Sequence, residues 1–320
     1  MENIPGNTSN QLHLNFDKNL ADGSGKDVQW NTAVANEAFR KAIFFGVDFT
    51  DFFKCFNPID PMKCANDFYT REGVVYTSDG NDYVELVRAK LGMDPTTDTK
   101  IGHVNAEKAA AYKKQAMEEL SAQGVTFPVH IDHWVNSASK AEQDNALVMK
   151  QCFEDSLGTD FIDFSIHTYV DFVSEMRSAS THSFGLFGYG GSFADPSTYL
   201  RHEQYNDTAW FTNKYSHIVD LPEDSEPAQL LKEYSRLYDK ANAIVDDNDA
   251  RLDAFADAEA FLLEHAITVP CFVTNSWCLT KVDPNSMMSS RLSGTGAKMK
   301  NWVTNVDGFT RAQILENAQN

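Results

Sequence analysis

The stretch from Phe184 to Leu200, FGLFGYGGSFADPSTYL, constrains the fold of this chain more than any other. Residues 184–189 are apolar and aromatic with glycine spacers, which predicts a central strand covered on both faces. Gly190 and Gly191 then allow a turn at positive φ and a close approach of another molecule's backbone. Asp195, followed by a proline, predicts a helix N-cap. Open α/β sheets hold ligands where a strand ends in such a glycine-rich loop.

The rest of the chain alternates short strands with longer helices. Strand patterns cover 11–16, 127–133, 161–166 and 267–273. Helical patterns cover 36–45, 49–56, 83–91, 106–120, 140–157, 169–178, 227–244 and 250–265. Such alternation implies right-handed crossovers between parallel strands. The predicted fold class is therefore α/β, with a mostly parallel sheet flanked by helices.

Net charge and the N-terminal sequence limit the partners and the location. The formal net charge is −19 with no dense Lys/Arg stripe, which argues against nucleic acid and anionic membrane surfaces as partners. No apolar run approaches the length of a membrane span, and the first residues lack the pattern of a secretory signal. Either the protein is cytosolic, or the chain begins downstream of its natural start.

The five cysteines show no zinc-binding spacing. Cys152 lies in a helical pattern and is expected to be a small buried hydrophobe. Cys55 and Cys64 flank a proline-containing loop, so a disulfide between them is an open alternative in an oxidising compartment.

A serine hydrolase is the first catalytic alternative. Residues 190–194, GGSFA, lie one residue away from the G-x-S-x-G nucleophile elbow around Ser192. In that motif a helix begins directly after the serine, whereas here Pro196 would clash with the first turn. No clear acid and histidine pair follows, so an esterase using Ser192 is the less favoured hypothesis.

Metal and cofactor motifs are weak. His130, Asp132 and His133 combine imidazole and carboxylate ligands, but in a strand His133 points away from the other two. The acidic run at 246–249 lacks the glycine and glutamate of a calcium loop. There is no phosphate-binding or dinucleotide-binding glycine loop. The prediction is therefore no metal and no cofactor.

Aromatic residues surround the glycine corner, defined here as residues 189–193. Phe187, Tyr189, Phe193 and Tyr199 would suit a flexible, partly apolar ligand bound by backbone hydrogen bonds and aromatic walls. The alternative is that these rings belong to the core, and for Phe187 that alternative is favoured.

Residues 189–200 resemble the W-x-x-D-Y-x-D-P-x-x-[FY]-L segment of the oligopeptide-binding proteins of bacterial ABC importers, solute-binding family 5. Further segments similar to that family follow in the same order as its motifs: 36–43 with Asp48, 105–109 with 119–124, and 256–260 with 266–270. Each motif is weak by itself, but together they extend over nearly the whole chain.

The resemblance implies a periplasmic-binding-protein-like fold of type II, which encloses its ligand between two lobes without catalysis. This chain resembles the C-terminal part. Residues 28–274 would form the C-terminal ligand-binding lobe, 1–27 an end piece of a first lobe, and 275–320 a return segment packing toward it. The first lobe and a lipoprotein signal would precede Met1. The family likeness further implies an extracytoplasmic location, permease and ATPase partners, and a monomer.

One departure from the motif concerns the ligand's amine. Many family members pair the D of W-x-x-D-Y with the α-ammonium of the peptide, and Ser192 takes that position here. A neutral hydrogen bond is about half as strong as a charge-assisted one. Asp195 is an alternative anchor, although its N-cap role competes. The expected ligand-binding residues are Tyr189, Gly190, Gly191, Ser192, Phe193 and Asp195, with Asn136, Ser137 and Ser139 more loosely. An oligosaccharide or a metal chelate remains an alternative ligand.

Overall fold

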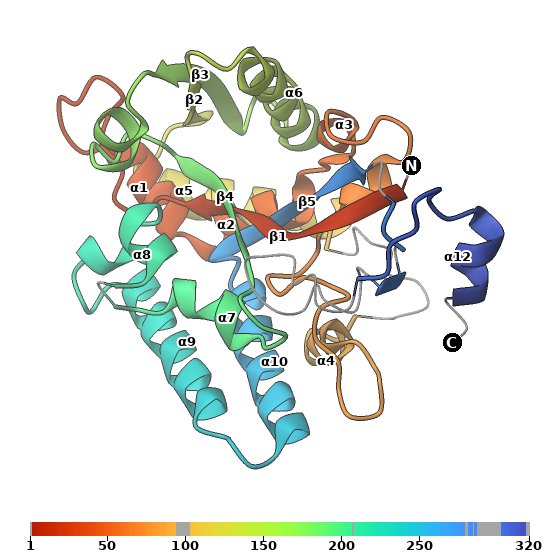
Figure 1. Ribbon diagram of the computed structural model, residues 1–320. Coiled ribbons are helices and arrows are strands. Elements are labelled where there is room, and N and C mark those ends of the chain that lie inside the picture. The colour runs from red at the N-terminus through yellow and green to blue at the C-terminus, as the bar shows by residue number, and fades with distance from the viewer. Residues whose placement is uncertain are drawn as a thin grey trace.

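The computed structural model describes residues 2–93, 103–206, 208–278, 281–283, 285–286 and 302–317, with 2–7 and 275–278 described by their backbone alone. Its elements lie in three tiers (Figure 1). The middle tier is a three-stranded sheet of β1 (Glu2–Leu14), β4 (Phe184–Gly190) and β5 (Thr268–Cys278). Above it lie the paired strands β2 (Val129–Asn136) and β3 (Ile162–Tyr169), and below it a long helical hairpin.

The middle sheet is antiparallel, in the order β4-β1-β5. Leu14 of β1 pairs with Phe184 and Thr8 with Gly190. Because β1 is the one described strand that pairs with β4, β4 is an end strand rather than a central one. The prediction of a central strand was wrong because an apolar run reports burial of faces and not the number of neighbouring strands. Phe184 is buried under Phe153, 5.6 Å away between ring centroids.

Strands β2 and β3 form the parallel pair that the sequence predicted, joined by helix α6 (Lys140–Leu157). Local signals set the limits of this helix: Ser139 Oγ accepts from the amide of Glu142 at 3.3 Å, and Gly158 ends it at φ 84°. The α/β class with flanking helices is confirmed. Among the described strands, however, parallel pairing is confined to β2 and β3, so the sheet is not mostly parallel.

Helices of the first half pack around these sheets. They are α1 (Val28–Ala35), α2 (Glu37–Gly46), α3 (Thr50–Lys54), α4 (Tyr83–Lys90) and α5 (Ala106–Ala122). The Asn36 side chain caps α2 by accepting from the amide of Phe39 at 2.9 Å. As the helical spacing predicts, Phe39, Ala42 and Ile43 are all buried.

The lower tier contains α7 (Ser197–Leu200), α8 (Trp210–Lys214), α9 (Glu226–Asn242) and α10 (Asn248–Glu264). The two long helices form the expected hairpin, and Asp247 caps α10. Helix α8 was not predicted. The helix expected over 169–178 is instead the end of β3 followed by a short π-helix, Phe172–Arg177, whose first amides bond to Asp171.

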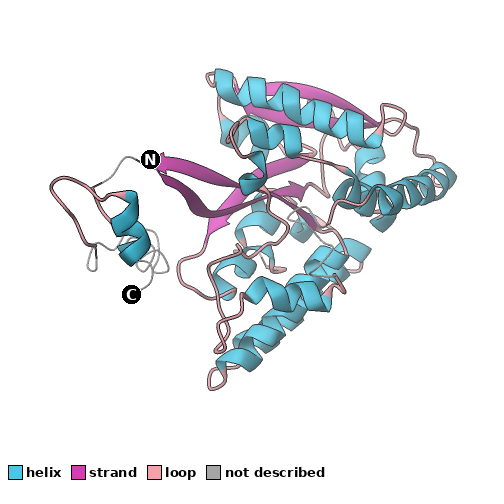
Figure 2. Ribbon diagram, turned by 90° about the vertical axis from the view of Figure 1, so that its right-hand side faces the viewer, coloured by secondary structure: helices cyan, strands magenta, loops and turns pink. Residues whose placement is uncertain are grey.

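The first strand belongs to the middle sheet, whereas the last described helix lies apart from it. Strand β1, from the predicted end piece, lies between β4 and β5 and so shares one sheet with the 28–274 segment. Figure 2 shows helices on both sides of this sheet and α12 (Arg311–Asn317) apart from the main body. Helix α12 buries no residue. The rest of the return segment largely lies outside the described residues.

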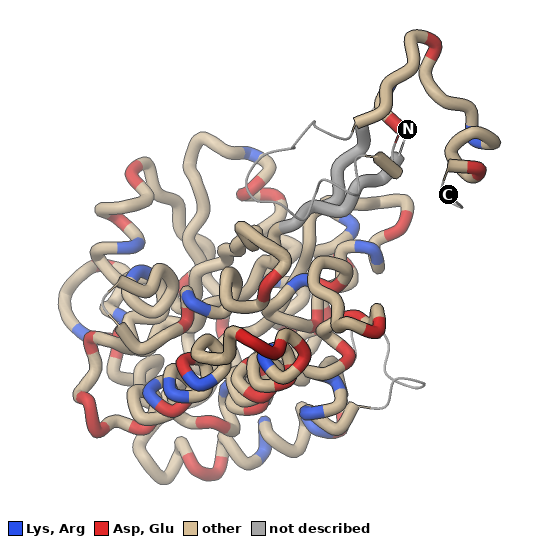
Figure 3. The backbone as a smooth tube through the Cα atoms, turned by 60° about the horizontal axis from the view of Figure 1, so that its bottom comes forward, with Lys and Arg blue, Asp and Glu red and all other residues tan. Residues whose placement is uncertain are grey.

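Three further observations bear on the sequence predictions. Cys55 is exposed, Cys64 is buried, and no disulfide joins them. In the part of the chain that the structure describes, no helix is long and apolar enough to cross a membrane. Basic and acidic positions are interspersed along the chain rather than separated on two faces (Figure 3).

Candidate ligand-binding site

A cavity of about 330 Å³ lies between the end strand β4 and the β2–β3 pair. Its volume falls within the range of roughly 300–1,000 Å³ that is usual for small-ligand pockets. Most of its lining is aromatic, with Phe52, Phe56, Trp134, Tyr169, Phe172, Phe184, Phe187 and Phe272 all contributing. Glu142 and Asn145 add polar groups. We call this space the aromatic cavity.

The walls of the aromatic cavity are held by ring contacts. Phe187 stacks on Tyr215 with centroids 4.2 Å apart and lies 5.4 Å from Phe172. On the opposite side Phe56 stacks on Phe272 at 4.6 Å. Phe187 therefore packs partly on the core, as favoured from the sequence, and also faces the cavity. Rings fixed in this way form a largely preformed site.

The glycine corner follows directly after the strand residues that line the cavity. The Tyr189 hydroxyl accepts a hydrogen bond from Arg201 Nη2 at 2.9 Å and lies 3.3 Å from Ser192 Oγ. The His202 ring packs on Tyr189 at 4.1 Å. Burial, with a further contribution from Arg201, lowers the pKa of His202 to about 4. The corner thus presents one guanidinium, a neutral imidazole and two hydroxyls.

The prediction of a turn at positive φ at the two glycines was wrong. Neither Gly190 nor Gly191 has a positive φ. A Cβ on Gly191 would lie 2.3 Å from Cε2 of Tyr199 and 2.8 Å from Oγ1 of Thr198. Glycine is required at position 191 because the chain's own tyrosine packs against the backbone there. Phe193, two residues further on, leaves 65% of its surface exposed.

Asp195 is engaged within the chain. Its carboxylate accepts from Arg251 Nε at 3.0 Å and Nη2 at 3.3 Å, and from the amide of Ser197 at 2.9 Å. Burial would raise the pKa of Asp195, but hydrogen bonds from Arg251 and Ser197 outweigh it and hold the pKa below its usual range. Helix α7 takes Pro196 as its N-cap residue, without a side-chain cap, so the predicted N-cap role of Asp195 was wrong. The Asp195 carboxylate is nevertheless engaged by Arg251 and Ser197.

Asn136, Ser137 and Ser139 form the turn from β2 into α6. Asn136 Oδ1 accepts from the amide of Ala138 at 2.8 Å, and the Ser137 carbonyl accepts from Gln143 at 2.9 Å. No hydrogen bond joins this turn to the glycine corner, although the structure describes both segments. The turn follows Trp134 and Val135, which do line the cavity. The predicted residues therefore border the cavity on two sides without forming its walls.

The cavity wall itself was largely missed from the sequence. Its rings come from segments as distant as Phe52 and Phe272, and no local pattern marks such convergence. For Trp134 and Tyr169 a signal existed, since both are aromatic residues at the carboxyl ends of parallel strands. Among the metal-ligand candidates, His133 lies away from His130 and Asp132, as strand alternation predicted, whereas His167 was missed. His133 is buried against Phe184 at 4.9 Å, while His167 of β3 approaches Asp132 at 2.6 Å.

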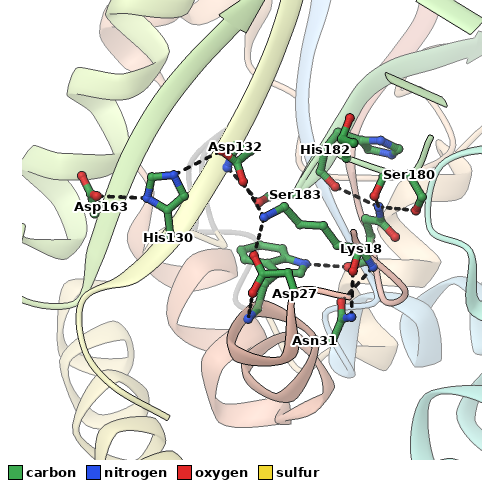
Figure 4. A network of polar contacts seen from close by, with 12 residues as sticks. Lys18, Asp27, Asn31, His130, Asp132, Asp163, Ser180, His182 and Ser183 are labelled. Carbon is green, nitrogen blue, oxygen red and sulfur yellow. Dashed lines mark hydrogen bonds and ion pairs between the residues drawn. The ribbon is translucent and has the colours of Figure 1, made fainter. Parts of the chain in front are cut away.

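A buried ion-pair network connects β2 to the segments before α1 and before β4 (Figure 4). Lys18 is completely buried, with Nζ 2.6 Å from Asp27 and 2.5 Å from Asp132. The amide of Asp132 donates to Ser183 Oγ, and the amide of Ser183 donates to the Asp132 carbonyl, each at 2.9 Å. The segment after β1 is thereby tied to β2, and β2 to the start of β4.

Comparison with known proteins agrees with this architecture. No protein-family model matches the chain. The oligopeptide-binding protein SarA of Streptococcus gordonii is 29% identical over 316 residues, covering 91% of this chain and 46% of that protein. The oligopeptide-binding protein AliA of Streptococcus pneumoniae is 29% identical over 256 residues, covering 74% and 38%. The chain is therefore similar in sequence to two oligopeptide-binding proteins over most of its own length.

Solved structures show the same fold. Listeria monocytogenes OppA bound to peptide matches with a TM-score of 0.60 and 15% identity, over 95% of this chain and 50% of that one. The substrate-binding domain of an oligopeptide ABC transporter from Bacillus anthracis matches with a TM-score of 0.59 and 18% identity, over 86% and 45%. The chain thus spans about half the length of the oligopeptide-binding relatives it matches.

Proposed function

We propose that this chain binds oligopeptides, without catalysis, as the C-terminal portion of the substrate-binding component of an ABC importer. The observation that carries the proposal is the position of β4. It is the end strand of its sheet, paired with β1 on one side, and its residues Leu186 and Phe187 line the aromatic cavity. An end strand beside apolar pockets can receive an extended peptide as an added strand.

In that mode the peptide backbone would pair with the outer edge of β4. Main-chain hydrogen bonds supply affinity that does not depend on the peptide's sequence, and alternate side chains enter pockets. The aromatic cavity would take one apolar side chain. Glu142 and Asn145 would place polar groups at its margin.

The glycine corner would offer no unpaired carboxylate to bind the ammonium group at the peptide's N-terminus. Ser192 provides a neutral hydroxyl, Asp195 is already paired with Arg251, and Arg201 adds a positive charge. We infer that peptides with a blocked amine bind at least as tightly as peptides with a free one.

Location and partners follow from the same proposal. An importer's substrate-binding component works outside the cytoplasm and delivers its ligand to permease and ATPase subunits. We propose an extracytoplasmic location, with attachment through a lipid anchor, and a monomeric state. Residues 1–27 and 275–320 would then connect the 28–274 lobe to a first lobe. Aromatic cavities also suit sugars, so an oligosaccharide is the competing ligand.

A thermal-shift screen of the purified chain tests the ligand class. Any ligand that binds only the folded state raises the melting temperature by mass action. We expect a mixture of short peptides to raise it and a panel of oligosaccharides to leave it unchanged. A shift with the oligosaccharides alone would overturn peptide binding. Hydrolysis of an activated ester that is lost in Ser192→Ala would support the esterase instead.

The cavity is tested by Phe187→Ala, which removes a wall ring. We expect this variant to bind apolar peptides at least tenfold more weakly, because a large apolar contact is lost. The matched control is Phe45→Ala, a partly buried ring that stacks on Tyr112 at 5.7 Å and does not line the cavity. Equal binding by the two variants would place the ligand elsewhere.

A further inference from the structure

Two histidine side chains on one face of the β2–β3 pair approach a single oxygen atom of Asp132. Asp132 Oδ1 lies 3.1 Å from His130 Nε2 and 2.6 Å from His167 Nε2. In the parallel register His130 lies opposite Asp163, and His167 opposite Trp134, so all these side chains leave the same face. Across the described ranges, no other group of three such residues brings potential metal ligands together.

Counted with neutral imidazoles, as they would be when ligating a metal ion, the groups around this cluster carry an excess of two negative charges. Asp132 Oδ2 contacts the buried ammonium of Lys18, which also contacts Asp27. Asp163 Oδ2 lies 3.0 Å from His130 Nδ1. Three carboxylates and one ammonium leave two negative charges when both imidazoles are neutral. One divalent cation would balance them.

Without a metal ion, protons on the facing nitrogens satisfy these contacts. A carboxylate oxygen only accepts hydrogen bonds, so each approach to Asp132 Oδ1 needs a proton on the facing Nε2. His130 must then donate from both ring nitrogens, one to Asp132 and one to Asp163. A metal ion can replace the two Nε2 protons while the Nδ1 bond to Asp163 remains. Carboxylates that bond a ligating histidine in this way fix its orientation.

We propose that His130, Asp132 and His167 form a binding site for a divalent transition metal of the zinc type, with Asp163 orienting His130. Imidazole and carboxylate together suit zinc, whereas calcium and magnesium prefer oxygen ligands. Zinc bonds of about 2.0–2.2 Å would place neighbouring ligand atoms roughly 3.3 Å apart, so the side chains need to move by under about 1 Å. The side chains of His130 and His167 are 44% and 30% exposed, which admits an ion and water ligands.

The proposed metal site adjoins the aromatic cavity, because one residue contacts both. Trp134, a cavity residue, stacks on His167 with centroids 4.8 Å apart and planes 23° from parallel. A bound ion would link β2 to β3 beside this ring. The same contact makes Trp134 a natural reporter of metal binding.

Calorimetric titration of the chelator-treated chain with Zn²⁺ tests the site. We expect saturable binding of one ion that His130→Gln and His167→Gln each weaken at least tenfold. Asp163→Asn should weaken it about tenfold, as loss of an orienting carboxylate typically does. Co²⁺ should quench the fluorescence of the wild type more than that of Trp134→Phe. Asp132 is left unchanged because its loss would remove one of the two carboxylates that pair with the buried Lys18.

The matched control is His265→Gln. His265 Nδ1 contacts one carboxylate, Glu37, at 2.7 Å, and no second histidine of the described chain joins that pair. We expect it to bind Zn²⁺ like the wild type. Absence of saturable Zn²⁺ binding overturns the proposal. So does wild-type affinity in His130→Gln or His167→Gln, provided that their metal-free melting temperatures match the wild type. Peptide binding is a separate readout, so either proposal can fail without the other.

Discussion

Arg201 sets the charge of the glycine corner. Its guanidinium donates to the Tyr189 hydroxyl, beside Ser192. A free peptide ammonium placed there would meet a like charge. Because Arg201 is exposed, the repulsion is worth at most about 1 kcal/mol.

We therefore expect Arg201→Gln to improve the binding of free-amine peptides by up to about fivefold, with no change for N-acetylated ones. Calorimetry on matched peptide pairs measures the difference. Arg236→Gln is the control, since Arg236 pairs with Glu233 on the surface of α9. Equal effects of the two variants would show that Arg201 acts only through net charge.

His182 makes the stability depend on pH. The ring is completely buried and donates to the Tyr215 carbonyl at 2.9 Å. Burial, with a contribution from His217, lowers the pKa of His182 to about 3, from 6.5 in an unperturbed histidine. The unfolded chain therefore binds the extra proton first. The stability that the neutral ring contributes is complete above pH 6.5 and is lost as the pH falls from there toward 3.

We expect the free energy of unfolding contributed by this ring to drop by about 2 kcal/mol between pH 7.5 and pH 5. Urea unfolding at the two pH values measures the drop. His182→Gln should be less stable at pH 7.5 but lose about 2 kcal/mol less on acidification. An unchanged loss in the variant would contradict the assignment.

Strand β4 is the proposed site of peptide recognition. Pairing along its outer edge predicts that the effect of a backbone change on affinity alternates along the peptide. In strand addition only alternate peptide residues direct their backbone groups at the edge strand. N-methylation at those positions removes a donor and should cost about 1 kcal/mol or more. The intervening positions should tolerate it. Calorimetry on a series of singly methylated peptides would reveal a period of two, and a uniform loss at every position would rule strand addition out.

The elements differ in how far the sequence determines them. Helix α6 was predictable at both ends because Ser139 and Gly158 act on their immediate neighbours. Strand β4 was predictable as a strand but not in its pairing, since its partner β1 lies about 170 residues away in sequence. The sequence predicted that His130 and His133 of β2 point to opposite faces. The position of His167 beside Asp132 depends on the register with β3, which the sequence does not show.

Contacts between residues far apart in the sequence join these elements, and no local sequence pattern predicts those contacts. The buried Lys18 holds Asp27 and Asp132 together, and the aromatic cavity draws rings from β2, β4, β5 and the α3 region. The candidate ligand residues were accordingly placed beside the cavity rather than on its walls. The fold could be inferred because the motifs of the resemblance extend along nearly the whole chain.

The most direct test of this account is calorimetric titration of the chain with one short apolar peptide in free and N-acetylated forms. Strand addition at β4 without a charged amine anchor predicts saturable binding of one peptide per chain, with the acetylated form bound at least as tightly. Binding that requires the free amine, or no binding by any peptide while an oligosaccharide binds, would contradict it.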